Sequence, residues 1–174
     1  ISIGYFRKEG NTQQLRVKSF YGDDEKILLQ DFIAALHKME TNNNKWCFTG
    51  HNIKEFDIPF ICRRLLINGL QVPPFLNFQN MKPWETNMVD TFQYWRFGDY
   101  KHYTSLKLLA AALKVPSPKD DIDGSMVGDV YWKEKNLARI VIYCQKDVVT
   151  TGNIVLRFKG LPLLDEEHIV IVNS

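Results

Sequence analysis

Two acidic positions, far apart in the sequence, are the strongest candidates for chemistry. Asp57 lies two residues before Pro59 in the segment 49–64. This segment follows a short apolar run typical of a strand, and its own apolar residues recur at the spacing of a helix. Tyr143 and Asp147 are four residues apart in an apolar periodic segment, so one face of a helix carries both. Carboxylate oxygens are hard ligands that suit magnesium or manganese, and a tyrosine hydroxyl can orient a water molecule. Together these groups could support metal-dependent hydrolysis.

Each position also has an ordinary structural explanation. A carboxylate at Asp57 with Pro59 in the first turn is typical of a plain helix N-cap. Tyr143, taken alone, is typical of a core tyrosine whose hydroxyl reaches the rim. The combination is rarer, because Asn52 precedes Asp57 by five residues and a Tyr-x-x-x-Asp segment follows much later.

This combination resembles the second and third motifs of the 3′-5′ exonucleases of the DEDD superfamily, in the tyrosine-containing branch. The resemblance is closest to the exonuclease domains of family B DNA polymerases and to their predicted stand-alone bacterial relatives, and it covers nearly the whole chain. It implies an α/β chain with a ribonuclease-H-like fold. Such a fold has a mixed sheet, antiparallel in its opening strands and then parallel, with helices on both faces.

The resemblance also implies roles for individual residues. Asp147 would ligate the metal on the nucleophile side, and Asp57 would support a second metal through water. The expected cofactors are therefore two divalent cations, magnesium or manganese. Tyr143 would orient the attacking water. Asn52 and Phe56 match positions that contact the terminal nucleotides of the substrate, whereas the neighbouring His51 receives no catalytic role.

The first motif of that family, an Asp-x-Glu pair, is missing from this chain. Residues 1–6 already have a strand pattern, without an initiator methionine or a preceding strand. We therefore expect residues 1–174 to form a single exonuclease-like domain that lacks its first strand. Metal binding by this chain should then be weak, with the acidic site empty or partly occupied in a crystal.

The elements that position the candidates alternate between strand and helix patterns. Residues 1–6 and 15–21 predict an antiparallel hairpin joined by a turn over residues 7–13, and Asp23 or Asp24 caps the next helix. Residues 46–48 predict the end of a buried strand, and Gly50 lets the chain leave it in a tight turn. The apolar residues expected to face a core from the first two helices are Ile27, Leu28, Phe32, Leu36, Met39, Phe60, Ile61, Leu65 and Leu66.

The second half of the chain continues this alternation. The segment 68–70 ends the helix that follows Asp57, and residues 73–84 predict a surface loop. Residues 88–89 predict a short strand, after which Asp90 or Thr91 begins another helix, with Asp90 as a cap rather than a metal ligand. A last long helix is expected from about residue 135 to beyond residue 158, and the segment Gly160-Leu161-Pro162 ends it.

Three further segments keep more than one interpretation. Residues 92–107 interleave aromatic and basic side chains, which suits either single-stranded nucleic acid or a buried aromatic layer with solvated charges. Ser105 begins a helix, and the acidic loop 116–129 after it is expected to carry solvated carboxylates rather than a calcium site. The tail 169–172 predicts an edge strand or an oligomer contact, so the oligomeric state stays open.

Composition sets broad limits on function. The 174 residues have a formal net charge of +2, which by itself does not argue for a nucleic-acid partner. No apolar run approaches a membrane span and no signal segment opens the chain, so we expect a cytoplasmic protein without a membrane partner. Cys47, Cys62 and Cys144 lie in apolar contexts and are expected to be reduced, buried thiols.

Three functions follow from the resemblance. The first is a metal-dependent 3′-5′ exonuclease that acts on single-stranded DNA or on frayed ends during DNA repair. The second keeps the reaction and moves the substrate to RNA, because the sequence shows no contact that would distinguish a 2′-hydroxyl. The third is a catalytically inactive relative that binds nucleic acid or a partner protein.

Overall fold

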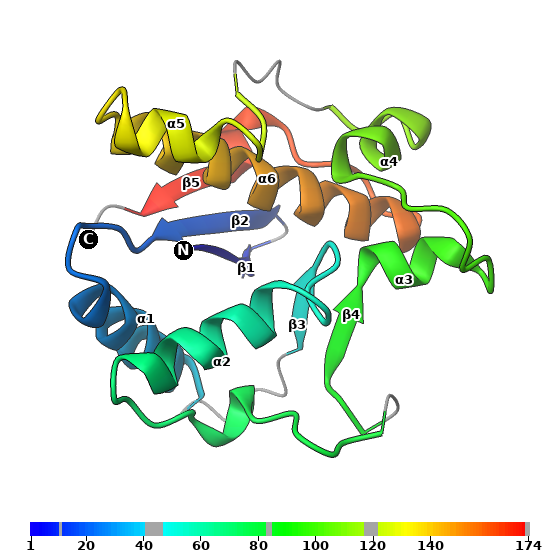
Figure 1. Cartoon of the computed structure of the whole chain (residues 1–174). Helices are drawn as coiled ribbons and strands as arrows, with labels where there is room; N and C mark the ends of the chain where they lie inside the picture. Colours follow the sequence, from blue (N-terminus) through cyan, green and yellow to red (C-terminus); the bar gives the residue numbers. More distant parts are fainter. Residues whose placement is uncertain (11, 41–46, 83–84, 117–121, 173–174) are drawn as a thin grey trace. The chain divides into compact units, whose positions relative to one another are not determined.

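The chain forms two compact units in a computed structural model that describes residues 1–10, 12–40, 47–82, 85–116 and 122–172. Unit 1 comprises Ile1–Tyr21 and His102–Ser174, and unit 2 comprises Gly22–Lys101. Figure 1 shows the elements of both units, and each unit is described here by itself. Among the described residues, no helix combines the length and the apolar character that crossing a bilayer requires.

A small mixed sheet with the strand order β1–β2–β5 lies in unit 1 (Figure 1). β1 (Ser2–Glu9) and β2 (Thr12–Ser19) pair antiparallel, and β5 (Ile169–Val172) pairs parallel with β2. The predicted hairpin and the predicted edge strand in the tail are therefore confirmed. The turn over residues 7–13 is wrong, because both strands extend into that segment and Glu9 pairs with Thr12.

The long helix α6 (Leu137–Phe158) packs on this sheet, as Figure 1 shows. The contact is close because glycines lie on both sides of it. A Cβ atom added at Gly4 would come within 2.7 Å of Val148 Cγ1, and one added at Gly152 within 3.1 Å of Leu15 Cδ2. Close packing of this kind fixes the rotation of α6 about its own axis, because a turned helix would bring larger side chains against the sheet.

Both ends of α6 agree with the sequence signals. Asn136 caps its start, where its side chain accepts a hydrogen bond from the backbone N–H of Arg139 at 3.1 Å. At its end Gly160 adopts a φ of 65°, and Leu161 N–H donates to Leu156 O at 2.9 Å. This left-handed glycine stop is the predicted end of the helix.

Two shorter helices complete unit 1. α4 (Leu106–Ala112) begins as predicted at Ser105, whose Oγ accepts from Leu108 N–H at 3.2 Å. α5 (Val127–Trp132) was not predicted and begins inside the expected acidic loop. It has six residues and no side-chain cap, so neither apolar periodicity nor a capping signal marks it. Residues 117–121 of that loop lie outside the described residues.

Unit 2 contains a pair of parallel strands from which two helices follow. β3 and β4 pair in register from Phe48 opposite Met88 to Gly50 opposite Asp90. The carboxyl ends of both strands therefore lie at one edge, where β3 leads toward α2 and β4 leads directly into α3. The elements of the unit are α1 (Glu25–Glu40), β3 (Phe48–Gly50), α2 (Asp57–Ile67), the short 3-10 helix η1 (Pro74–Leu76), β4 (Met88–Asp90) and α3 (Thr91–Arg96).

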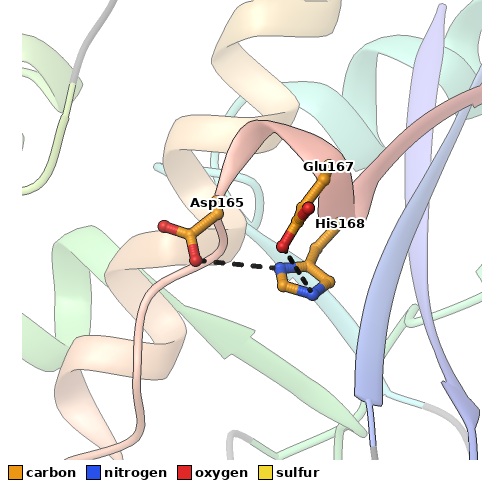
Figure 2. Close-up of side chains that lie close together, drawn as sticks. All are labelled: Asp165, Glu167 and His168. Carbon is orange, nitrogen blue, oxygen red and sulfur yellow. Dashed lines mark ion pairs between the residues drawn. The ribbon is translucent and has the colours of Figure 1, made fainter.

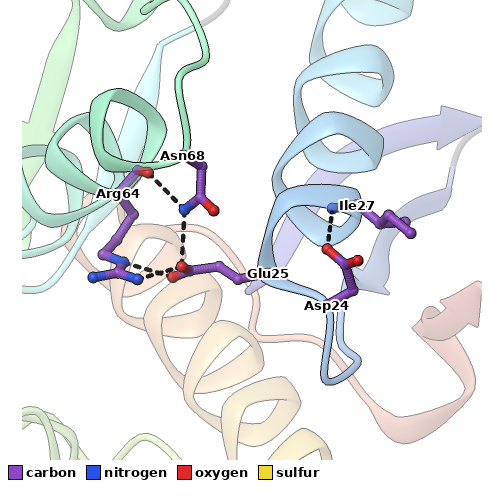
Figure 3. A network of polar contacts seen from close by, with 5 residues as sticks. All are labelled: Asp24, Glu25, Ile27, Arg64 and Asn68. Atoms are coloured by element: carbon purple, nitrogen blue, oxygen red, sulfur yellow. Dashed lines mark hydrogen bonds and ion pairs between the residues drawn. The ribbon is translucent and has the colours of Figure 1, made fainter.

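A polar network ties the first turn of α1 to the last turn of α2 (Figure 3). Arg64 Nε donates to Glu25 Oε1 at 2.6 Å, and a second guanidinium nitrogen of Arg64 donates to Glu25 Oε2. Asn68 Nδ2 donates to the same carboxylate at 2.8 Å. Asp24 Oδ1 accepts from Ile27 N–H at 3.0 Å, which identifies Asp24 as the cap of α1. The far end of α2 is thus anchored.

Several predicted core positions are wrong because the apolar stripe of each helix is rotated from its expected place. In α1, Ile27 is 56% exposed, and Leu29, which was not predicted, is buried with Phe32 and Leu36. In α2, Phe60 and Leu66 are exposed, whereas Ile58 and Leu65 are buried. Ile58, Ile61 and Leu65 are spaced by three and four residues, so they share the inward face.

Other local predictions also need correction. Residues 73–84 are more than a surface loop, because η1 places Leu76 in the core at 1% exposure. The thiol of Cys47 is exposed, and those of Cys62 and Cys144 are half-buried rather than buried. All three cysteines are free, as predicted.

Candidate active site

The turn from β3 into α2 carries three of the residues proposed from the sequence: Asn52, Phe56 and Asp57. It begins at Gly50, where an added Cβ atom would lie 2.7 Å from Ile53 Cβ. Glycine is required there because the backbone folds back tightly on itself, which agrees with the predicted turn. Ile53 is buried and holds the turn to the rest of unit 2.

Asp90, at the end of β4, fixes this turn from the neighbouring strand. Its carboxylate is 3% exposed and accepts hydrogen bonds from the backbone N–H groups of Asn52 at 3.0 Å and Lys54 at 3.2 Å. It also caps α3, accepting from Phe92 N–H at 3.0 Å and Gln93 N–H at 3.3 Å. The predicted cap is confirmed, but the bonds to the turn were missed. Only the position of Asp90 directly after a predicted strand could have signalled them, because parallel strands end side by side.

A second contact joins the same two strand ends. Thr91 Oγ1 donates to Gly50 O at 3.2 Å, and it lies 3.0 Å from His51 Nδ1. A hydroxyl has one proton to donate, so His51 Nδ1–H is the donor in the second bond. His51 therefore has a structural role in the turn.

Asn52 is the residue in this turn whose conformation is least typical. Its backbone has a φ of 62°, in the left-handed region that asparagine tolerates better than most residues. Its side-chain Oδ1 is buried and accepts no hydrogen bond from the described residues. A buried acceptor without a donor costs free energy, on the order of 1–3 kcal/mol. Uncommon backbone geometry and an unused buried acceptor occur together at functional sites more often than elsewhere.

Asp57 is the first residue of α2 and not its N-cap, which corrects the sequence interpretation. Phe56 occupies the cap position, and no side chain caps this helix. The preceding turn supplies the acceptors instead: Phe56 N–H donates to Asn52 O at 3.0 Å, and Ile58 N–H donates to Ile53 O at 3.1 Å. The Asp57 carboxylate is therefore not engaged in capping α2.

The surroundings of the Asp57 carboxyl group disfavour its negative charge. Although the residue reaches the surface, neighbouring protein removes enough water to raise the pKa of Asp57, and the negative charge of Asp90 raises it further. A bound cation would stabilise the ionised carboxylate in such a place. The donor chemistry at Asp57 thus fits a hard divalent cation.

Two aromatic rings lie exposed beside Asp57. Phe56 is 62% exposed and Phe60 is 51% exposed. Their rings are nearly parallel, with an interplanar angle of 11° and 6.0 Å between centroids. A pair of exposed parallel rings presents the flat apolar surface on which nucleic-acid bases stack. Phe60 was expected to face the core, so this feature was missed.

The second group of candidates lies on α6 in unit 1. Tyr143 and Asp147 are both half-buried and stand one turn apart, as their spacing predicted. Gln145 fixes the helix beside them, because its Nε2 donates to Ser19 Oγ at 3.0 Å. Gly124, from the described part of the acidic loop, lies next to the tyrosine: a Cβ atom added there would be 4.0 Å from the Tyr143 hydroxyl.

The structure therefore brings the predicted residues together in two sets. Asn52, Phe56 and Asp57 share one turn of unit 2, and Tyr143 and Asp147 share one helix of unit 1. The assignment of all five residues to a single site stays a prediction.

A different cluster has the closest grouping of metal-binding residue types in the described part of the chain. Asp165, Glu167 and His168 lie around η2 (Glu166–His168), with their ligand atoms within 4.8 Å of one another (Figure 2). His168 Nδ1 is 4.0 Å from Asp165 Oδ2, and Nε2 is 3.8 Å from Glu167 Oε1. Both ring nitrogens thus face carboxylates at the surface, contacts that become ion pairs only when the imidazole is protonated, and surface contacts of this kind need no metal.

Comparison with known proteins identifies the family. The model of one family matches residues 1–167, and this family is described as a predicted 3′-5′ exonuclease related to the exonuclease domain of PolB. The chain belongs to this family. No match was found among curated proteins or among solved structures. The matched residues lie in both units of the chain, and they include the turn at Asp57 and the helix that carries Asp147.

Proposed function

We propose that this family member is a metal-dependent 3′-5′ exonuclease that removes nucleotides from the 3′ end of single-stranded DNA. The observation that carries the proposal is the state of Asp57: it reaches the surface at the start of α2 without being its N-cap, and partial loss of water together with the charge of Asp90 raises its pKa. Such a carboxylate would be stabilised by a nearby positive charge. It is suited to hold a cation next to a phosphodiester, whose hydrolysis adds negative charge to an anionic group.

Each of the five predicted site residues has a role in this proposal. Asp57 and Asp147 would hold divalent cations, which when bound supply charge stabilisation and an acidified water. Tyr143 would orient the attacking water through its hydroxyl group. Asn52 would contact the terminal nucleotide, and the exposed Phe56 ring would stack on its base.

A ribonuclease-H-like fold belongs to the same proposal. Its support is the sheet order β1–β2–β5, in which an antiparallel pair is extended by a parallel strand, and the parallel pair β3–β4 with a helix following each strand. In open sheets of this kind, ligands bind beyond the carboxyl ends of parallel strands. Asp57 and Asp90 stand at that edge of the β3–β4 pair.

The test is digestion of 5′-labelled single-stranded DNA and RNA of equal sequence. Protein from the complete open reading frame is used, so that any Asp-x-Glu strand encoded before Ile1 is present. With manganese we expect a ladder that shortens from the 3′ end, and with chelator we expect none. Asp57→Asn and Asp147→Asn should each lower the rate by about 10³-fold, which corresponds to several kcal/mol of lost transition-state stabilisation.

Asp129→Asn is the matched control. Asp129 is an exposed carboxylate of α5, paired with Lys133 at 2.8 Å, so its loss should leave the rate unchanged. Full activity in Asp57→Asn or Asp147→Asn would contradict the proposed site. Cleavage of RNA but not of DNA would show that the substrate is RNA. Binding without cleavage of either strand would favour a catalytically inactive relative.

A further inference from the structure

The end of α3 exposes a group of aromatic rings that the proposed site does not use. Tyr94 is 51% exposed, Phe97 81% and Tyr100 78%. With the basic residues Arg96 and Lys101 they form what we call the aromatic patch, which lies entirely in unit 2. The sequence left open whether this segment is a buried layer or a binding surface. Phe92 is buried at 1% exposure, but the three rings of the patch are on the surface.

The rings of the patch are held in place. The Arg96 guanidinium lies over the buried Phe92 ring, 4.0 Å from its centroid, and also 5.5 Å from the centroid of Tyr100. Tyr94 and Phe97 contact each other edge to face, with 5.9 Å between centroids. Rings that are already ordered lose little conformational entropy when a ligand stacks on them, so the patch is prepared for binding.

Phe97 has an unfavourable backbone conformation in addition to its exposed side chain. It ends α3 in the left-handed conformation, with φ 44° and ψ 36°, where glycine or asparagine is the ordinary choice. Gly98, with a φ of 90°, follows directly and provides flexibility at the next residue. Apart from its edge contact with Tyr94, this large apolar ring is little buried by the described residues of unit 2, so its strain is poorly offset by packing. This combination is expected where the ring itself is needed for binding.

The charges of the patch indicate an anionic partner. Arg96 and Lys101 are its two cations, and Asp99, the acid among the described residues 94–101, accepts from the Lys101 backbone N–H at 2.9 Å. The patch therefore carries a net charge of +1. Flat rings alternating with cations match single-stranded nucleic acid, in which unpaired bases stack and phosphates meet basic side chains.

The patch is connected to the candidate site through α3. This helix has six residues, so its end lies about 9 Å from its start at 1.5 Å per residue. Asp90 caps the start of α3 and also accepts the hydrogen bonds that fix the turn at Asn52 and Lys54. Because consecutive stacked nucleotides are about 3.4 Å apart, a strand whose end is at this turn would reach the patch within about three nucleotides.

We propose that the aromatic patch binds a single-stranded nucleic acid a few nucleotides away from the terminal nucleotide held at the Asn52–Asp57 turn. This inference rests on the proposed function for the position of the strand's end. The stacking itself needs unpaired bases and does not depend on whether the strand is DNA or RNA.

The test is fluorescence anisotropy with the protein from the complete open reading frame, in chelator so that no strand is cut. Labelled dT15, rU15, dT3 and a 15-base-pair blunt duplex are the probes. Combining Phe97→Gly with Tyr100→Leu removes two rings, and each lost stacking contact should weaken binding about 10-fold or more. We therefore expect the affinity for dT15 to fall about 100-fold, and the affinity for dT3, which at about 3.4 Å per nucleotide reaches only the near edge of the patch, to fall much less.

Single variants separate binding from folding. Phe97→Gly should raise the melting temperature, because glycine relieves the left-handed strain, while it weakens dT15 binding. Phe97→Trp should retain binding. Lys101→Met should reduce the slope of log affinity against log salt by about 0.7, the value for one phosphate contact on a single strand. Trp132→Ala is the matched control, since Trp132 is 69% exposed with Lys135 over its ring but belongs to unit 1.

The outcomes distinguish this inference from the proposed function. If the double variant binds dT15 as tightly as the wild type, or if duplex binding shows the same dependence on the rings, the inference is overturned even where cleavage occurs. If the wild type cuts neither DNA nor RNA but binds dT15 or rU15 through the two rings, the patch stands and the exonuclease proposal fails. The ratio of dT15 to rU15 affinity identifies the source of the strand.

Discussion

The two sets of candidate residues are positioned by different means. Tyr143 and Asp147 are held by a single long helix, and the spacing of four residues is enough to put them on one face. The Asn52–Asp57 turn is held by bonds that cross 36 and 38 positions of sequence, from Lys54 and Asn52 to Asp90. One set depends on local geometry, and the other depends on a distant buried carboxylate.

The difference predicts where each set is vulnerable. On α6 a substitution away from the contacts of the helix with the sheet leaves the helical spacing intact, so at such positions only the functional side chains themselves should matter. In the turn a residue that contacts no substrate should matter as well, because it orders the backbone of the residues that do. Substitutions at Asp90, Tyr143 and Glu25 test this contrast in order of decreasing expected effect.

Asp90→Asn should have the largest effect on unit 2. The asparagine Oδ1 can still accept at the place of Asp90 Oδ1, but without the negative charge, and its NH2 group then faces the Lys54 N–H that Asp90 Oδ2 accepted, so this buried bond is lost without replacement. We expect the free energy of unfolding to fall by about 2–4 kcal/mol, measured by urea denaturation. Exonuclease activity should also fall, at a temperature at which the variant is still folded.

Asp24→Asn is the matched control for that change. Asp24 caps α1 through one exposed hydrogen bond to Ile27 N–H, and asparagine caps a helix about as well as aspartate. Stability should therefore change by only a few tenths of a kcal/mol, with activity unchanged. Equal effects of the two substitutions would show that Asp90 is an ordinary cap and that its bonds to the turn carry no special weight.

Tyr143→Phe should reduce activity without disturbing the turn. The proposed role of the hydroxyl is to orient water, and losing an orienting partner of this kind typically costs about 10- to 100-fold. The loss should appear in kcat rather than in KM, since the substituted ring keeps its shape. Tyr21→Phe removes a hydroxyl from an exposed tyrosine of the same unit and should have no effect. A wild-type kcat in Tyr143→Phe would leave Tyr143 as a core tyrosine.

How far the sequence could predict the molecule follows from the same contrast. Features encoded within a few residues were predicted: the stop at Gly160, the caps at Ser105 and Asp90, and the hairpin of β1 and β2. Features that depend on distant packing were not. The periodicity of α2 fits more than one orientation, and only the packing of Ile58 and Leu65 decides that Phe60 points outward.

The candidate site shows the same limit. Tyr-x-x-x-Asp is visible as spacing, whereas the position of Asp57 two residues before Pro59 fits a plain cap as well as the metal-binding role that the resemblance implies. The sequence could not show that Phe56 N–H and Ile58 N–H already find acceptors in the preceding turn, which leaves the Asp57 carboxylate out of capping. Nor could it show that Asp90 reaches back to Asn52, since no spacing rule links residues so far apart.

Glu25→Gln should have the smallest effect, and it tests whether the far end of α2 helps to position Asp57. The hydrogen bond from Arg64 lowers the pKa of Glu25, with a further contribution from Asn68. The pKa of Glu25 is lower in the folded state than in the unfolded state. The ionised carboxylate therefore adds stability at pH values above the unfolded-state pKa, and this stability is lost as the pH falls through the folded-state pKa. The denaturation midpoint of Glu25→Gln should therefore be slightly below that of the wild type at pH 7 and equal to it under acid conditions. The effect is small because the side chains of Arg64 and Glu25 are 34% and 38% exposed, so water screens the charge pair.

If the activity of Glu25→Gln is unchanged, the turn and Asp90 alone position Asp57. If activity falls together with the midpoint, the anchoring of α2 at Glu25 contributes as well, and the turn is less independent than its bonds to Asp90 suggest.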